Sequence, residues 1–183
     1  MTEDKSLAIG IACNETIQID TMLCLLQALR TVDVPNTVIT AKSCYVARNR
    51  NEIVKQAQAF GVSHLLFLDT DMAFETEGIN KLLAHDKDIV GGMYNKRRLP
   101  LTNIVQEFDG QTELFEVKEG FLPTGFLMIK MSVFDKVPEP WFETMSTRNW
   151  AEDRYFCEEA RKVGFQMYCD PTIKLRHLGN YPY

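Results

Sequence analysis

The stretch from His64 to Met72 constrains the fold more than any other part of the chain, because four uninterrupted apolar residues are followed directly by two carboxylates. A run this short and this apolar is typical of a strand buried on both faces, as in a parallel sheet. Asp69 and Asp71 fall where such a strand leaves the sheet. Ligands of open α/β sheets bind at the carboxyl ends of strands, so both carboxylates are candidate site residues.

The close spacing of Asp69 and Asp71 has two interpretations. Two neighbouring carboxylates repel each other unless a proton or a cation relieves the repulsion. Oxygen ligands suit a hard or borderline cation such as Mg²⁺ or Mn²⁺, which can in turn bind phosphates. However, Asp-Thr-Asp is also an ordinary turn sequence, and the tripeptide alone favours the turn. The remainder of the chain has to decide between the two.

Composition narrows the class of protein. With 183 residues, 45% apolar and 25% charged, the chain has the length and composition of one globular domain, here residues 1–183. A net charge of −5 argues against general binding to nucleic acid. The five cysteines are scattered and predict neither a disulfide framework nor a zinc cluster. No signal peptide or bilayer-spanning run is recognisable, so we expect a cytoplasmic protein without a membrane span.

Strand-like and helix-like segments alternate along the first half of the chain. This alternation predicts an α/β domain with a mostly parallel central sheet flanked by helices. The expected strands are Leu7–Cys13, Thr37–Thr40, the apolar run Leu65–Leu68 and Asp88–Gly92, and the clearest expected helix is Ser43–Phe60, followed by Gly61 as its stop.

The pattern changes after residue 103. Two short apolar runs flank Asp109-Gly110, which is a strong turn signal, and this arrangement predicts a small antiparallel hairpin. The runs are Ile104-Val105 and Leu114–Val117. Further on, Asn149 followed by Glu152 has the spacing of a capping box and predicts the start of a helix.

Two polar groups lie beside the expected strands. Arg48, Asn49, Arg50 and Asn51 form a cluster in the first turns of the helix that leads into the Asp-x-Asp strand, and this cluster could be ordinary surface or could lie near the same sheet edge as the carboxylates. Lys96, Arg97 and Arg98 follow the strand at Asp88–Gly92 and could face phosphates or form a solvated loop. The chain has no Gly-x-Gly-x-x-Gly and no Gly-x-x-x-x-Gly-Lys, which disfavours a dinucleotide oxidoreductase and a P-loop nucleotidase.

Five separated segments, taken together and in this order, resemble a small GT-A type glycosyltransferase of the nucleotide-diphospho-sugar transferase superfamily, similar to family 2. The resemblance covers most of the chain, although no single segment is specific. The segments are Ala47-Arg48-Asn49, Leu66–Met72, Thr124–Ile129, Glu152–Cys157 and His177-x-Gly179.

The resemblance implies a fold, a cofactor and a reaction. The fold is a Rossmann-like GT-A domain, and the cofactor is Mn²⁺ or Mg²⁺. The reaction is the non-processive transfer of one sugar from a nucleoside-diphosphate sugar to an acceptor hydroxyl on an unidentified saccharide, lipid or protein. The implied metal residues are Asp69, Asp71 and His177, and the implied donor-binding residues are Arg48, Asn49, Asp69, Lys96, Arg97, Thr124 and Gly125.

The Glu-Asp pair is implied to act on the acceptor. In an inverting enzyme Asp153 would be the general base, with Glu152 as the second candidate, whereas in a retaining enzyme the acid would only orient the acceptor. The sequence leaves this choice open, as it does the nucleotide, the sugar and the oligomeric state.

Two departures from the family pattern favour the transfer of a single sugar, or a catalytic domain that works with a partner. The chain is short for an enzyme with its own acceptor domain, and it lacks the Gln-x-x-Arg-Trp motif of processive synthases. One alternative is a nucleotidyltransferase that forms a sugar nucleotide, but the expected glycine-rich basic loop is replaced by Asn14-Glu15-Thr16. The other alternative is a non-catalytic module that binds a sugar nucleotide or a carbohydrate.

Overall fold

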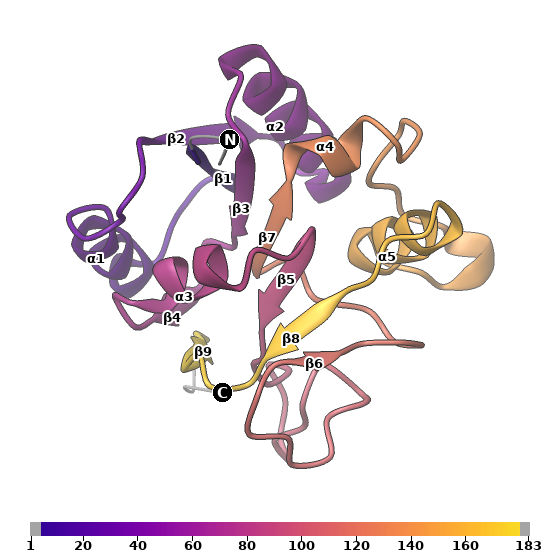
Figure 1. Ribbon diagram of the computed structural model, residues 1–183. Helices are drawn as coiled ribbons and strands as arrows, with labels where there is room; N and C mark the ends of the chain where they lie inside the picture. Colours follow the sequence, from indigo (N-terminus) through magenta and orange to yellow (C-terminus); the bar gives the residue numbers. More distant parts are fainter. Residues whose placement is uncertain (1–4, 180–183) are drawn as a thin grey trace.

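The structure, a computed structural model that describes residues 5–179, is built on a central sheet of seven strands. The strands are β1 (Leu7–Cys13), β2 (Asn36–Lys42), β3 (His64–Leu68), β5 (Ile89–Gly92), β6 (Phe115–Glu116), β7 (Phe126–Lys130) and β8 (Tyr168–Asp170). Their order across the sheet is β2-β1-β3-β7-β5-β8-β6 (Figure 1).

Strand β7 makes this sheet mixed. β1 pairs parallel with β2 and β3, and β5 pairs parallel with β8, but β7 lies between β3 and β5 and is antiparallel to both. β6 also runs antiparallel to its neighbour β8. The other five strands therefore share one direction. The predicted α/β fold is confirmed, and the mixed sheet differs from an all-parallel one through the insertion of β7.

Helices cover both faces of the sheet, and each face has its own apolar core. One core contains residues of α2 (Val46–Phe60), α4 (Met131–Phe134) and α5 (Glu152–Lys162), and the other contains residues of α1 (Ile19–Ala28) and α3 (Gly78–His85). Successive residues of β3 alternate between them, since Leu65 and Phe67 join the first core while Leu66 and Leu68 join the second. Burial on both faces explains why β3 is continuously apolar.

The ends of the helices follow the sequence only in part. α2 ends at Gly61, whose φ of 66° is left-handed as predicted for a helix stop. The capping-box prediction at the start of α5 is wrong, because α5 begins after Ala151 without a side-chain cap. Asn149 instead has a φ of 53° and ends the short 3₁₀ turn η1 (Ser146–Arg148). An antiparallel bridge between Met145 and Trp150 closes this loop before the helix starts, which takes Asn149 out of reach.

The predicted hairpin around Asp109-Gly110 is also wrong. The turn itself is present, with Gly110 at a φ of 79°, but Phe115–Glu116 pairs with β8 and residues 104–105 form no strand. The carboxylate of Glu107 accepts hydrogen bonds from the following segment and folds it into a compact loop. The small antiparallel pair of this protein is formed by β4 (Met72–Phe74) and β9 (Leu175–His177), which are distant in sequence.

Within residues 5–179, the helices are all too short or too polar to cross a bilayer.

Candidate functional site

The antiparallel placement of β7 brings two of the predicted motifs together. Because β7 runs opposite to β3, the start of β7 lies beside the end of β3. The backbone N–H of Asp69, which follows β3, donates to the carbonyl of Gly125 over 3.0 Å. The Asp-x-Asp motif and the Thr124-Gly125 segment therefore meet at one edge of the sheet.

Arg50 links the Asp-x-Asp motif to the Glu-Asp motif. Its guanidinium donates from Nη2 to Asp69 Oδ1 over 2.8 Å and from Nε to Glu152 Oε1 over 3.3 Å. The side chain is only 3% exposed and lies over the ring of Phe67, with 5.3 Å from Cζ to the ring centroid. Burial alone lowers the pKa of Arg50, but the charges of Asp69 and Glu152 more than offset this and raise the net value. A permanently charged arginine thus holds the start of α5 next to the end of β3.

Arg50 is the site residue that the sequence analysis missed. It was one member of a polar cluster at the start of the Ser43–Phe60 helix, and only its neighbours Arg48 and Asn49 were singled out. A signal was present, because Arg50 has helical spacing with the apolar residues Val46 and Ile53 and therefore points toward the core. A cation at a core-facing position has to find buried anions, and Arg50 finds two.

Asp153, the candidate base, lies at the start of α5 next to the Arg50 ion pairs. It is half-buried, and its Oδ1 accepts a hydrogen bond from the N–H of Arg154 over 2.7 Å. Burial, followed by repulsion from Glu152, raises the pKa of Asp153 from 3.8 to about 6. A carboxylate with this pKa is ionised at neutral pH and is a better proton acceptor than an ordinary aspartate.

Tyr94 and Gly125 form the wall of the site beside Asp69. The N–H of Gly125 donates to the hydroxyl of Tyr94 over 3.1 Å, and Tyr94 is only 5% exposed. Burial, then the charges of Asp69 and Asp153, raises the pKa of Tyr94 well above its usual value and keeps the hydroxyl neutral. A Cβ at Gly125 would lie 3.0 Å from Asp69 Oδ2 and would collide with the Tyr94 hydroxyl, so only glycine fits. Thr124 is buried beside it.

Asp71 belongs to a second polar group on the rim of the site. Its Oδ2 pairs with Nη1 of Arg97 over 2.6 Å, and its Oδ1 lies 3.4 Å from Nε2 of His177. The pairing of Met72 with His177 in the β4–β9 ladder brings the imidazole to this carboxylate. Burial raises the pKa of Asp71, but His177 and Arg97 more than offset this and lower the net value.

The orientation of His177 bears on whether a cation fits here. Its Nδ1 lies 3.3 Å from the carbonyl oxygen of Asn95, which can only accept a hydrogen bond. In the tautomer that donates from Nδ1 to this carbonyl, Nε2 would present its lone pair to a cation placed between the imidazole and the Asp71 carboxylate. A metal-binding histidine has this arrangement, with the second nitrogen donating to a carbonyl. Asp71 and His177 could therefore provide one oxygen and one nitrogen ligand to a divalent cation.

The three predicted metal residues are not brought together as one set. Asp71 and His177 are adjacent, whereas Asp69 is bound by Arg50. Over residues 5–179, no cluster of three or more His, Cys, Asp or Glu side chains has the geometry to hold a metal ion.

The remaining predicted donor-binding residues differ in their surroundings. Asn49 is buried, and its amide donates to the carbonyls of Cys13 and Ser43, over 3.1 and 3.0 Å, and so braces the edge of the sheet. Arg48 is exposed and lines a hollow of about 470 Å³ at the start of α2. Lys96 is half-buried in the same loop as Arg97.

The chain shares its fold with solved structures of low sequence identity. A197 from STIV matches with a TM-score of 0.65 at 20% identity, over 96% of this chain and 86% of that one. The inositol-1-phosphate CTP transferase from T. maritima matches with a TM-score of 0.54 at 10% identity, over 97% and 91% of the two chains. A putative nucleotide-diphospho-sugar transferase from Desulfovibrio desulfuricans G20 matches with a TM-score of 0.54 at 8% identity, over 92% and 80%.

By sequence, the chain matches no family profile and no curated protein. At these identities the structural likeness establishes the fold alone: the Rossmann-like α/β fold of nucleotidyltransferases and nucleotide-sugar transferases.

Proposed function

We propose that this protein is a glycosyltransferase that moves one sugar from a nucleoside-diphosphate sugar to an acceptor hydroxyl. One observation carries the proposal. The buried guanidinium of Arg50 joins Asp69 to Glu152 and so brings the Asp-x-Asp motif, the Gly125 wall and the candidate base Asp153 to one sheet edge. In open α/β sheets this edge is where ligands bind.

In this proposal Asp153 accepts the proton of the acceptor hydroxyl. Its pKa of about 6 leaves it ionised at neutral pH and still basic enough to assist the attack. Glu152 is neutralised by Arg50 and serves to position the start of α5. Arg97, which pairs with Asp71, and its neighbour Lys96 supply positive charge for the diphosphate, and exposed Arg48 is available to the nucleotide.

A divalent cation fits the proposal through Asp71 and His177. When bound there, Mn²⁺ or Mg²⁺ would neutralise charge on the leaving diphosphate. An imidazole ligand favours Mn²⁺ over Mg²⁺. Asp69 would act on the donor sugar or the outer metal shell while held by Arg50.

Thermal unfolding against a panel of nucleoside diphosphates and sugar nucleotides, with and without Mn²⁺, tests the donor site. A ligand that binds only the folded protein raises the midpoint by mass action. We expect one nucleotide to do so in a metal-dependent way, and Asp71→Ala to abolish that shift. Asp88→Ala is the matched control, because Asp88 precedes β5 and so lies at the end of the strand away from Arg97. A metal-dependent shift of parental size in Asp71→Ala would refute the metal site.

Transfer assays then test the base. Asp153→Asn should bind the donor as the parent does but lose most of the transfer rate, by about 10²- to 10⁴-fold for a general base. Glu159→Gln, on the outer side of the same helix, should behave like the parent. Parental transfer by Asp153→Asn would remove the base assignment.

A nucleotidyltransferase is the second candidate, because the T. maritima structure of the same fold is a CTP transferase. Against it, the loop after β1 carries Asn14-Glu15-Thr16 in place of glycine-rich basic sequence. Product analysis separates the reactions: release of pyrophosphate from a nucleoside triphosphate and a sugar phosphate indicates this candidate, whereas release of a nucleoside diphosphate indicates the transferase. Metal-dependent binding without either product would indicate a binding module.

A further inference from the structure

The irregular segment from Val117 to Leu122, which leads into Thr124-Gly125, is held by side chains from outside it. On one side, the carboxylate of Glu107 accepts hydrogen bonds from three successive backbone N–H groups, over 2.6 to 2.9 Å. These donors belong to Lys118, Glu119 and Gly120. Burial raises the pKa of Glu107, but the three N–H groups more than offset this and lower the net value, so the carboxylate stays ionised.

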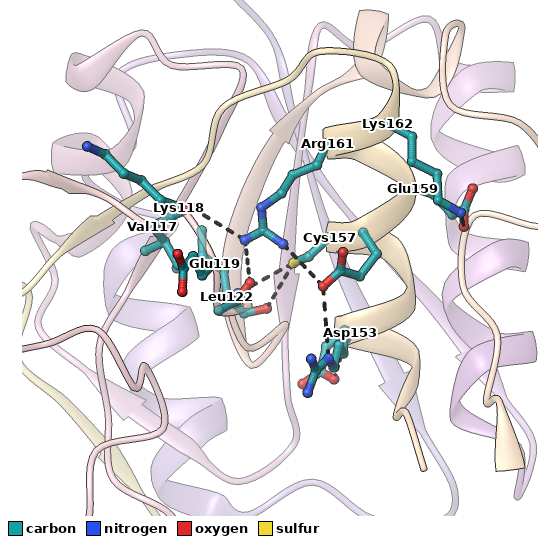
Figure 2. Close-up of polar contacts among 12 residues, drawn as sticks. Val117, Lys118, Glu119, Leu122, Asp153, Cys157, Glu159, Arg161 and Lys162 are labelled. Carbon is teal, nitrogen blue, oxygen red and sulfur yellow. Dashed lines mark hydrogen bonds and ion pairs between the residues drawn. The ribbon is translucent and has the colours of Figure 1, made fainter. Parts of the chain in front are cut away.

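Helix α5 holds the same segment from the other side. Nη2 of Arg161 donates to the carbonyls of Val117 and Gly120, with 3.4 Å to the former. The Sγ of Cys157 lies 3.4 Å from the N–H of Leu122 and 3.7 Å from its carbonyl. Figure 2 shows Arg161 and Cys157 pointing from α5 toward Val117 and Leu122. Val117 still donates its N–H to the carbonyl of Met167 over 2.8 Å. For the residues after it, these contacts and those of Glu107 replace the backbone pairing that an irregular segment lacks.

The helix that provides these contacts also carries the candidate base. Asp153, Cys157 and Arg161 are spaced four residues apart and therefore lie along one face of α5. Gly125 follows the held segment by three residues and bonds to Asp69 and Tyr94. The contacts of Arg161 and Cys157 thus connect the element that carries Asp153 directly to the segment that leads to the Gly125 wall.

We infer that Arg161, together with Glu107, is a positioning residue that holds the Val117–Gly125 segment against α5 and so sets the Gly125 wall relative to Asp153. We call the contacts of Arg161 and Glu107 with this segment the clamp. The clamp rests on these contacts alone, and only its consequence for the reaction rests on the proposed function. Arg161 touches neither Asp153 nor Asp69. Its influence on the reaction is indirect and depends on the position of the Val117–Gly125 segment.

The chain offers a matched control on the same turn of the helix. Lys162 is the next residue, is exposed, and pairs with Glu159 on the outer side of α5 (Figure 2). Arg161→Met and Lys162→Met remove one cation each from the same helix end. They differ in whether the clamp is lost.

Hydrogen exchange and thiol labelling test the clamp without any assay of activity. In Arg161→Met, the amides of residues 118–122 and 125 should exchange at least tenfold faster, and Cys157 should become reactive to iodoacetamide, as measured by peptide mapping. Lys162→Met should match the parent. Arg161→Lys, which keeps a cation with N–H donors but lacks the longer, planar guanidinium, should be intermediate and serves in place of Arg161→Met if the latter does not fold. Unchanged exchange and labelling in both Arg161 variants would overturn the clamp.

Kinetics test the positioning role. A misplacement of about 1 Å can cost up to about 10²-fold in rate, so we expect kcat for transfer to fall roughly tenfold to 100-fold in Arg161→Met. The KM for the donor should change less than kcat, since Arg48, Lys96 and Arg97, the proposed contacts of the nucleotide and the diphosphate, lie outside the held segment. Arg161→Lys should recover part of kcat. A loosened segment with parental kcat, or a lowered kcat with a parental exchange pattern, would overturn the positioning role. If the parent transfers no sugar, the proposed function fails, and the labelling result alone decides the clamp.

Discussion

Asp69 and Asp71 are two residues apart in one motif, yet the fold gives them opposite surroundings. Asp69 is bound by Arg50, whose side chain is 3% exposed, whereas Asp71 is bound by Arg97, whose side chain is 51% exposed. The difference lies in the cations, since the Asp69 side chain itself is 28% exposed and that of Asp71 15%. A cation removed from water, such as Arg50, depends on its anionic partners and is costly to leave unpaired. A solvated partner is exchanged at little cost. The comparison indicates that Asp69 is a fixed part of the framework, and that Asp71 is free to take another cation.

The largest effect should come from removing the buried cation. Arg50→Met leaves Asp69 and Glu152 half-buried without a partner, and loss of one member of a buried ion pair costs about 3–5 kcal/mol. Urea unfolding measures the loss. Arg48→Met, two residues away and exposed, should change the free energy of unfolding by less than about 0.5 kcal/mol. Equal effects of the two substitutions would contradict the distinction between the two aspartates.

A smaller effect should come from Tyr94, which joins the two halves of the site. Its hydroxyl accepts from Gly125 on the Asp69 side, and its ring lies 5.2 Å from that of His177 on the Asp71 side. Tyr94→Phe leaves the buried N–H of Gly125 without an acceptor and should cost about 1–3 kcal/mol in urea unfolding. Tyr45→Phe, at an exposed tyrosine, is the control. Parental stability of Tyr94→Phe would mean that the Gly125 wall does not depend on this bond.

The raised pKa of Asp153 should make the free energy of unfolding depend on pH. Its pKa is about 6 in the folded protein against an ordinary value of 3.8, so the folded state binds the proton more tightly than the unfolded chain does. Stability therefore falls as pH rises from about 4 to 6, and the penalty is fully present above 6. Asp153→Asn removes the penalty and should gain roughly 1–2 kcal/mol over the parent at pH 8 but little at pH 4, as urea unfolding at both values will measure. An equal gain at both pH values would mean that Asp153 is not perturbed.

The smallest effect on stability should come from the exposed cation. Arg97→Met should change the free energy of unfolding by less than about 1 kcal/mol, because solvent screens its pair with Asp71. In the same variant Mn²⁺ should raise the melting temperature more than in the parent, since the competing guanidinium is gone. Arg98→Met, at the exposed neighbouring residue, is the control. An unchanged Mn²⁺ response in Arg97→Met would show that Asp71 does not exchange its partner.

The strands and the site differ in how far the sequence predicted them. β1 and β3 are where the apolar runs placed them, and α2 ends at Gly61 as its pattern predicted. The hairpin at Asp109-Gly110 was wrong although its turn signal was strong. A turn signal describes a few residues, whereas β6 obtained its partner from β8, about fifty residues further along the chain.

The sequence by itself determined the alternation of strands and helices and the position of the Asp-x-Asp carboxylates at the end of a buried strand. Both are encoded in the spacing of apolar residues over a few turns or a few strand residues. Only the tertiary structure decided that β7 would enter the sheet between β3 and β5, and that Asp69 and Glu152 would be the two partners of Arg50. Strand order and burial depend on contacts between distant segments. A buried ion pair contributes to the free energy of folding only when those segments are in contact.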